Sequence, residues 1–135
     1  MNAANTGRPG QAAGIAILLW SADPSVPERL VTPFFHAAAA AAMDTPVEMY
    51  FTAASVRLLV PGVAAQLRAS PYHAKTVYDA MQEAAAHGAI FRACTDALHA
   101  QGIDPAALIP ECSGRGGAVQ FMARAADLQW RTLVF

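Results

Sequence analysis

The sequence predicts a single-domain α/β fold, a three-layer α/β sandwich in which helices flank a mainly parallel, five-stranded, flavodoxin-like sheet. Three observations support this fold class. Short apolar runs without polar alternation are typical of parallel strands that are covered on both faces. Helical segments separate these runs, as βαβ units require. The length of 135 residues suits one domain with a single core.

The first half of the chain predicts two strands and two helices. Residues 1–13 are small, polar and interrupted by Gly and Pro, so we expect a disordered tail before a domain at 14–135. The run GIAILLW at 14–20 predicts the first strand. Ser25 followed by Glu28 resembles a capping box, which predicts a helix from there to about Met43. PVEMYFT at 46–52 predicts the second strand, and a short helix follows at 53–59.

The second half continues the alternation. Gly88 and Gly102 each stand where a helix is expected to end. SGRGG at 113–117 is best interpreted as a tight glycine turn that opens a helix. In chain order, the expected elements are a helix at 71–87, a strand at 89–94, a helix at 95–101, a short strand at 108–112, a helix ending near 127 and a final strand at 131–135.

Composition excludes several classes of function. Nine basic and ten acidic residues give a formal net charge of −1, which does not favour nucleic acid or an anionic membrane surface. The apolar run at 15–20 is too short to span a membrane, and we expect a cytoplasmic protein. Two cysteines cannot form a disulfide framework, and no Cys or His cluster has zinc spacing. We therefore expect reduced thiols, no metal and no cofactor.

Chemistry-bearing residues collect where the predicted strands end. In an open parallel sheet, the loops after the carboxyl ends of the strands form the ligand crevice. Cys94 ends a strand and precedes a helix, so nearby backbone N–H groups and the helix dipole favour thiolate over thiol. The alternative is that Cys94 is a small apolar residue that closes the strand. Position alone leaves both interpretations open.

A Cys-His hydrolase is disfavoured because the histidines are badly placed. His87 precedes the strand that Cys94 ends, which puts the two roughly 20 Å apart. His36 and His99 lie well inside their helices, and only His73 could return to the carboxyl edge.

Three other residues near this edge leave alternatives open. Cys112 could be a resolving thiol, a metal ligand or a packing residue, and we favour packing because its spacing from Cys94 is unlike CxxC. Arg115 in SGRGG could partner an anion, which is a weaker interpretation than a glycine turn. Arg92 is a charge inside a covered strand, so it must be paired or lie at a subunit contact.

The order of these features resembles the DsrE-like family of small α/β proteins, which includes sulfur-relay subunits. The most specific part is A-C-T-D-A-L-x-x-x-G-I at 93–103, supported by VEMYFTAASVRLL at 47–59 and by the final strand. A glycine common in the family is Ser55 here. The resemblance implies that Cys94 carries sulfane sulfur as a persulfide, and that the protein is a homotrimer or homohexamer with a sulfur donor or acceptor protein as partner.

The sequence therefore predicts a DsrE-like sulfur carrier or sulfurtransferase with Cys94 as its catalytic residue. The expected supporting residues are Ser21, Thr52, Ala53, Thr95, Asp96, Cys112, Gly114 and Arg115. The alternative is a homo-oligomeric module that binds a small ligand, an anion or a nucleotide without transfer activity. A redox switch between Cys94 and Cys112 is a third hypothesis.

Overall fold

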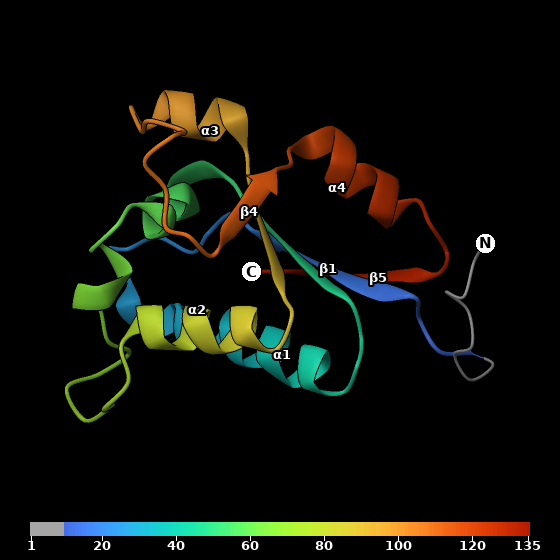
Figure 1. Cartoon of the computed structure of the whole chain (residues 1–135), viewed down its shortest axis with the longest axis horizontal. Coiled ribbons are helices and arrows are strands. Elements are labelled where there is room, and N and C mark those ends of the chain that lie inside the picture. Colours follow the sequence, from blue (N-terminus) through green and yellow to red (C-terminus); the bar gives the residue numbers. More distant parts are fainter. Residues whose placement is uncertain (1–9) are drawn as a thin grey trace.

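A five-stranded, all-parallel sheet forms the centre of the molecule, which confirms the predicted fold class. The computed structural model describes residues 10–135, and the strand order is β4-β3-β2-β1-β5 (Figure 1). The strands are β1 (Gly14–Leu19), β2 (Val47–Phe51), β3 (Ile90–Ala93), β4 (Cys112–Arg115) and β5 (Trp130–Val134). No helix within 10–135 is both long and apolar enough to cross a membrane.

Helices lie on both sides of the sheet. The α-helices are α1 (Val31–Ala42), α2 (Val77–Ala86), α3 (Thr95–Ala100) and α4 (Ala118–Ala125), and short 3-10 helices form η2 (Pro27–Arg29), η3 (Ala53–Leu59) and η4 (Ala64–Gln66). Figure 1 shows α1 and α2 side by side below the sheet, with α3 and α4 above it. The predicted three layers are therefore present.

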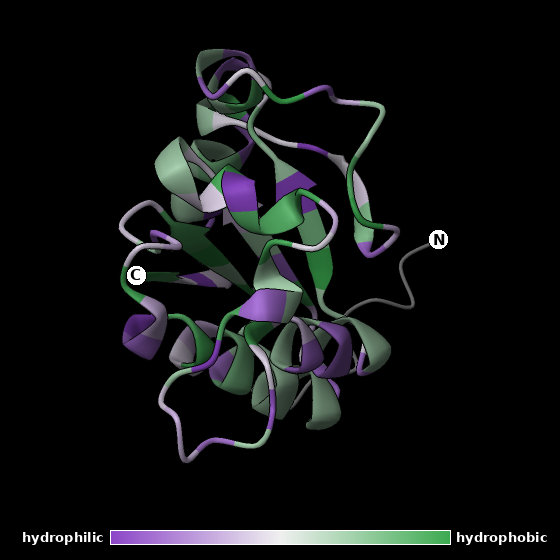
Figure 2. Cartoon of the chain, turned by 90° about the vertical axis from the view of Figure 1, so that its left-hand side faces the viewer, coloured by the Kyte–Doolittle hydropathy of each residue, from purple (hydrophilic) through white to green (hydrophobic). Residues whose placement is uncertain are grey.

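The main core lies between the sheet and the pair α1 and α2. Phe34 of α1 stacks on Phe51 of β2 at 6.0 Å between ring centroids, and Phe51 meets Phe91 of β3 edge-on at 5.3 Å. Figure 2 shows the apolar colour of the strands between the helical layers. A smaller cluster on the opposite face joins Ala16 and Tyr50 to Phe121, the one residue of α4 that is buried.

The first helix begins later than Ser25, so the predicted capping box is wrong. The Ser25 amide donates to the Asp23 carboxylate at 2.9 Å, and η2 precedes an α-helix that starts at Val31. Pro33 explains this start, because proline lacks an N–H and fits only the first turn of a helix.

The helix predicted at 71–87 is also shorter. It begins at Val77, where Thr76 and Asp79 form a reciprocal capping box. Residues 71–72 form a turn and residues 73–76 form no helix, partly because the Ser70 hydroxyl accepts a hydrogen bond from the amide of Tyr72 at 3.2 Å. The two predicted helix ends are confirmed, since Gly88 and Gly102 have φ of 112° and 68°.

The fourth strand lies at Cys112–Arg115, not at 108–112 as predicted. Pro110 has no N–H to donate to a ladder, and Ile109 instead donates its amide to the Leu59 carbonyl at 2.9 Å. The glycine turn predicted at 113–117 is wrong as well, because Gly114 is extended and pairs with Arg92 of β3. α4 starts immediately after Gly117.

Most of the predicted tail lies in residues 1–9, outside the described residues. Gly10 to Ala13 form no helix or strand. The amide of Ala13 donates to the Gln129 carbonyl. This contact ties the residue before β1 to the loop before β5.

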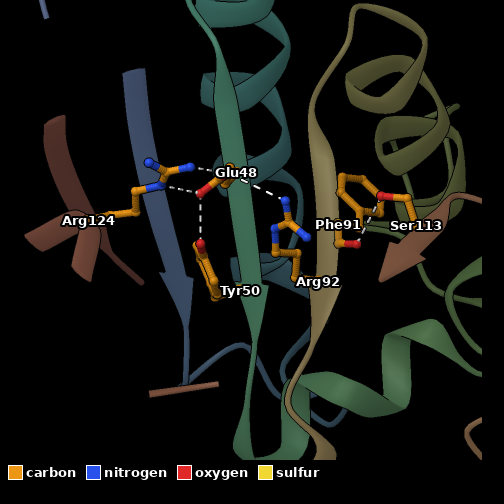
Figure 3. A network of polar contacts seen from close by, with 6 residues as sticks. All are labelled: Glu48, Tyr50, Phe91, Arg92, Ser113 and Arg124. Atoms are coloured by element: carbon orange, nitrogen blue, oxygen red, sulfur yellow. Dashed lines mark hydrogen bonds and ion pairs between the residues drawn. The ribbon is translucent and has the colours of Figure 1, made fainter. Parts of the chain in front are cut away.

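A buried carboxylate, Glu48 of β2, holds α4 against the sheet. Its oxygens accept hydrogen bonds from Arg124 Nε at 2.9 Å and Nη2 at 3.0 Å, and from the Tyr50 hydroxyl at 2.7 Å (Figure 3). Arg92 Nη2 lies 3.5 Å from Glu48 Oε2, while Arg92 Nε is buried without a hydrogen-bond partner among the described residues. The Arg124 guanidinium also lies 4.0 Å from the centroid of the Trp130 ring.

This network sets the ionisation of its members. Burial alone would raise the pKa of Glu48, but hydrogen bonds from Arg124 and Tyr50 and the positive charges of both arginines outweigh burial and lower that pKa. Burial and the hydrogen bond to Glu48 raise the pKa of Tyr50 to about 12. Glu48 therefore stays ionised and Tyr50 stays protonated at neutral pH.

Glu48→Gln should destabilise the fold in a pH-dependent way. The amide keeps the shape but leaves two arginines without their counter-charge, so we expect a loss of about 2–4 kcal/mol in the free energy of unfolding in neutral solution. The pKa of Glu48 is lower in the folded state than its ordinary value of 4.5. The ionised Glu48 therefore stabilises the wild type fully above pH 4.5, and this stabilisation is lost as the pH falls through the folded-state pKa. Urea denaturation of both proteins across this range measures the difference.

Glu83→Gln is the matched control, because Glu83 pairs with Lys75 in the open, with 43% of its side chain exposed. No measurable change in stability is expected for this surface pair. A Glu48→Gln deficit of the same size in neutral and acid solution would contradict the assigned role of the charge.

Candidate functional site

Cys94 lies at the carboxyl edge of the sheet, as the first residue after β3. Its amide donates to the Phe51 carbonyl at 2.9 Å, and its own carbonyl accepts from the Leu98 amide at 3.0 Å. Cys94 is therefore the N-cap of α3, although its side chain forms no capping hydrogen bond with Thr95, Asp96 or the residues after them. The thiol is half-buried.

The turn after β2 forms the next part of this edge. The Thr52 amide donates to the Leu19 carbonyl at 3.1 Å and to the Ser55 hydroxyl at 3.0 Å. Ser55 is fully buried, and its hydroxyl lies 2.7 Å from the Leu19 carbonyl oxygen. Ser55 thus ties the ends of β1 and β2 together. Ala53 has φ of 50° in this turn.

An apolar cavity lies between α4 and the sheet and reaches Cys94. Its volume is about 270 Å³. The walls are the side chains of Leu18, Tyr50, Phe121 and Met122, with Thr52 and Cys94 at the sheet edge and Gly116, Gly117 and Ala118 at the start of α4. The Tyr50 and Phe121 rings meet edge-on with centroids 5.5 Å apart, which fixes one wall.

A second, more open and more polar hollow meets the first at Cys94. Thr95, Asp96, Arg115 and Gln120 contribute its polar side chains, and Gly116 to Ala118 border both spaces. Arg115 Nη1 lies 3.4 Å from the Thr95 hydroxyl. A Cβ built on Gly117 would lie 3.8 Å from the Cys94 sulfur, so the start of α4 is in contact range of the thiol.

The structure brings together only some of the predicted site residues. Thr52, Thr95, Asp96 and Arg115 border the hollows beside Cys94, as expected. The others lie elsewhere: Ser21 lines a separate hollow with Phe135, Ala53 lines neither hollow beside Cys94, and Cys112 and Gly114 line another hollow with Pro110.

Cys112 is in a different environment from Cys94. Its sulfur lies 3.8 Å from the Phe91 carbonyl oxygen and 3.7 Å from that of Gly114. Burial raises the pKa of the Cys112 thiol, although the Gly114 backbone and the charge of Arg115 act in the opposite direction. Less Cys112 thiolate is therefore present at neutral pH, in agreement with the packing interpretation.

The described histidines do not approach the thiol. None of them borders either hollow beside Cys94. His36 Nδ1 is bonded to the Thr32 carbonyl, and His73 Nδ1 lies 3.1 Å from the Lys75 carbonyl. Within residues 10–135, no group of three or more His, Cys, Asp or Glu side chains could hold a metal ion.

Sequence reasoning missed the apolar cavity and the network beside it. Glu48 is 4% exposed and pairs with Arg92. A signal existed, because both residues are charged positions inside covered strands that follow each other in βαβ order. No comparable signal linked Arg124 or Met122, on a helix far along the chain, to this face of the sheet.

Comparisons with known proteins define the fold. No family model matches the sequence, and no curated protein matches it. The YchN protein from E. coli superimposes with a TM-score of 0.68 at 18% identity, over 90% of this chain and 98% of that chain. MTH1491, a protein of unknown function from Methanobacterium thermoautotrophicum, gives 0.61 at 19% identity, over 89% and 96%. The chain thus shares the fold of these two proteins.

The two thiols should differ in their rate of alkylation. Cys94 borders two hollows, whereas burial raises the pKa of Cys112, so iodoacetamide at neutral pH should modify Cys94 about tenfold faster or more. Mass spectrometry of peptides from a time course measures both rates. The fast phase should vanish in Cys94→Ser and remain in Cys112→Ser; faster modification of Cys112 would contradict this assignment.

Proposed function

We propose that the protein is a sulfur carrier, or sulfurtransferase, in which Cys94 holds sulfane sulfur as a persulfide and passes it to a partner. The observation that carries this proposal is the position of the half-buried Cys94 thiol, at the junction of two hollows on the carboxyl edge. The shared fold and the A-C-T-D-A-L-x-x-x-G-I segment at 93–103 add support.

The proposed chemistry uses one nucleophile twice. The Cys94 thiolate attacks the outer sulfur of a donor persulfide R–S–SH, the donor S–S bond breaks, and R–S⁻ leaves while Cys94 becomes a persulfide. An acceptor thiolate then attacks the outer sulfur of that persulfide, and the Cys94 thiolate is released. Neither step requires a histidine base. This agrees with the two hollows beside Cys94, since no described histidine lines either of them.

The position and surroundings of Cys94 are compatible with this role. The thiol lies at the start of α3, and its sulfur is within contact range of the start of α4. Arg115 adds positive charge and Asp96 adds negative charge to the open hollow. Both cysteines are free, as a carrier in the reducing cytoplasm would need.

We further propose that the protein works as a homotrimer or homohexamer. Large apolar side chains are exposed on and near α4 and β5, including Val119, Met122, Leu128 and Val134, each more than half exposed. β5 is also an edge strand. Sedimentation equilibrium should give three or six times the mass of one chain; a monomer at micromolar concentration would contradict this proposal.

A ligand-binding module without transfer activity is the second candidate. The observation that favours it is the apolar cavity of about 270 Å³, which has room for a small molecule whether or not the thiol reacts. Arg115 beside the open hollow would suit an anionic group.

Intact-mass spectrometry tests the carrier hypothesis. After incubation with a sulfane-sulfur donor, the wild type should gain about 32 Da, and a reductant should remove this mass. Cys112→Ser should gain the same mass, while Cys94→Ser should not, because only Cys94 borders the hollows. If the wild type stays unmodified under conditions in which Cys94 is alkylated, the carrier hypothesis fails and the binding module becomes the better explanation.

A further inference from the structure

The cavity beneath α4 has the properties of a site for an apolar group. Leu18, Phe121 and Met122 line it with hydrocarbon, sulfur and aromatic ring atoms. Its volume of about 270 Å³ exceeds the 150 Å³ or so of an engineered apolar cavity that binds benzene. One ring or a branched alkyl group therefore fits.

The two side-chain hydroxyls of the cavity walls already have partners. The Tyr50 hydroxyl donates to Glu48 at 2.7 Å, so the ring and not the hydroxyl serves the cavity. Thr52 forms a capping box with Ser55 in the turn after β2. Water in this space finds few partners, and an apolar occupant that replaces it gains affinity.

The position of Cys94 defines how such an occupant would lie. Cys94 borders both spaces, with the apolar cavity on one side and the hollow containing Arg115 and Gln120 on the other. A molecule that carries a sulfane sulfur between an apolar group and a polar group matches this arrangement. The apolar group would enter the cavity, the sulfur would meet Cys94, and the polar group would face Arg115.

We propose that the cavity beneath α4 binds the apolar, ring-sized group of a small organic sulfane-sulfur donor and presents its sulfur to Cys94. This inference rests on the proposed sulfur-carrier function and names the class of donor. An aryl thiosulfonate, R–SO₂–S⁻, is a suitable probe. The Cys94 thiolate attacks the terminal sulfur, the bond between the two sulfurs breaks, and the sulfinate R–SO₂⁻ leaves, so that Cys94–S–S⁻ forms and the charge balances.

The first test compares two donors that differ only in the apolar group. Benzenethiosulfonate and methanethiosulfonate are each reacted with the wild type, and intact mass gives the second-order rate of persulfide formation. The rate with benzenethiosulfonate is divided by the rate with methanethiosulfonate. This ratio is then divided by the same ratio measured for free N-acetylcysteine, which corrects for the different intrinsic reactivities of the two donors. Burial of the ring should leave a preference of about 10- to 100-fold for the aromatic donor.

Two phenylalanine substitutions in α4 test whether the preference for the aromatic donor comes from the cavity. Ala118 borders the cavity, so Ala118→Phe should fill it and bring the corrected ratio close to one. Ala125, on the same helix, is also exposed but borders neither hollow, so Ala125→Phe should keep the wild-type ratio. Equal loss of the preference in both variants would overturn the assignment of the cavity.

A binding measurement separates this inference from the proposed function. Benzenesulfinate cannot transfer sulfur, and in Cys94→Ser it should raise the melting temperature while methanesulfinate should not. No stabilisation together with a corrected ratio of one would overturn the inference and leave a carrier function intact, provided that persulfide forms. Failure of both donors to load Cys94 would overturn the carrier function and the donor assignment together, even if benzenesulfinate binds.

Discussion

The ion pair between Glu48 and Arg124 is the contact on which the arrangement of the site depends. α4 buries only Phe121 against the sheet, which is little apolar contact for a helix of eight residues. The bidentate bonds from Arg124 at 2.9 and 3.0 Å add a directional attachment, and the packing of Arg124 on Trp130 extends it to β5. Since α4 supplies one wall of the cavity beside Cys94, the shape of that cavity follows from this attachment.

The same network also affects where the Cys94 thiol lies relative to α4. Arg92 and Cys94 are two residues apart, so their side chains leave β3 on the same side of the sheet. Arg92 reaches Glu48, and a Cβ on Gly116 would come within 2.9 Å of Arg92 Cδ. Glycine at 116 therefore lets the chain pass over Arg92 on its way to α4. This close approach brings Gly117 next to the Cys94 sulfur.

The predictable and unpredictable parts of the structure differ in the range of the interactions behind them. The strands at 14–20 and 46–52 and the helix ends at Gly88 and Gly102 follow from local patterns of hydrophobicity and backbone freedom, and the structure confirms them. β4 was misplaced because its four residues, CSGR, have weak strand propensity and pair only through contact with β3. Cys94 was located from the strand before it, whereas its cavity depends on α4, which follows it by more than twenty residues.

A buried ion pair is a costly way to attach a helix, since desolvation of Glu48 offsets much of the attraction to its partners. Apolar residues of similar volume would stabilise α4 about as well. They would not fix its rotation and height, however, because apolar packing tolerates small shifts that a bidentate hydrogen bond does not. The proposed sulfur carrier would need a defined helix position beside its thiol more than it needs extra stability. The ion pair between Glu48 and Arg124 is therefore consistent with a role for α4 in forming the cavity beside Cys94.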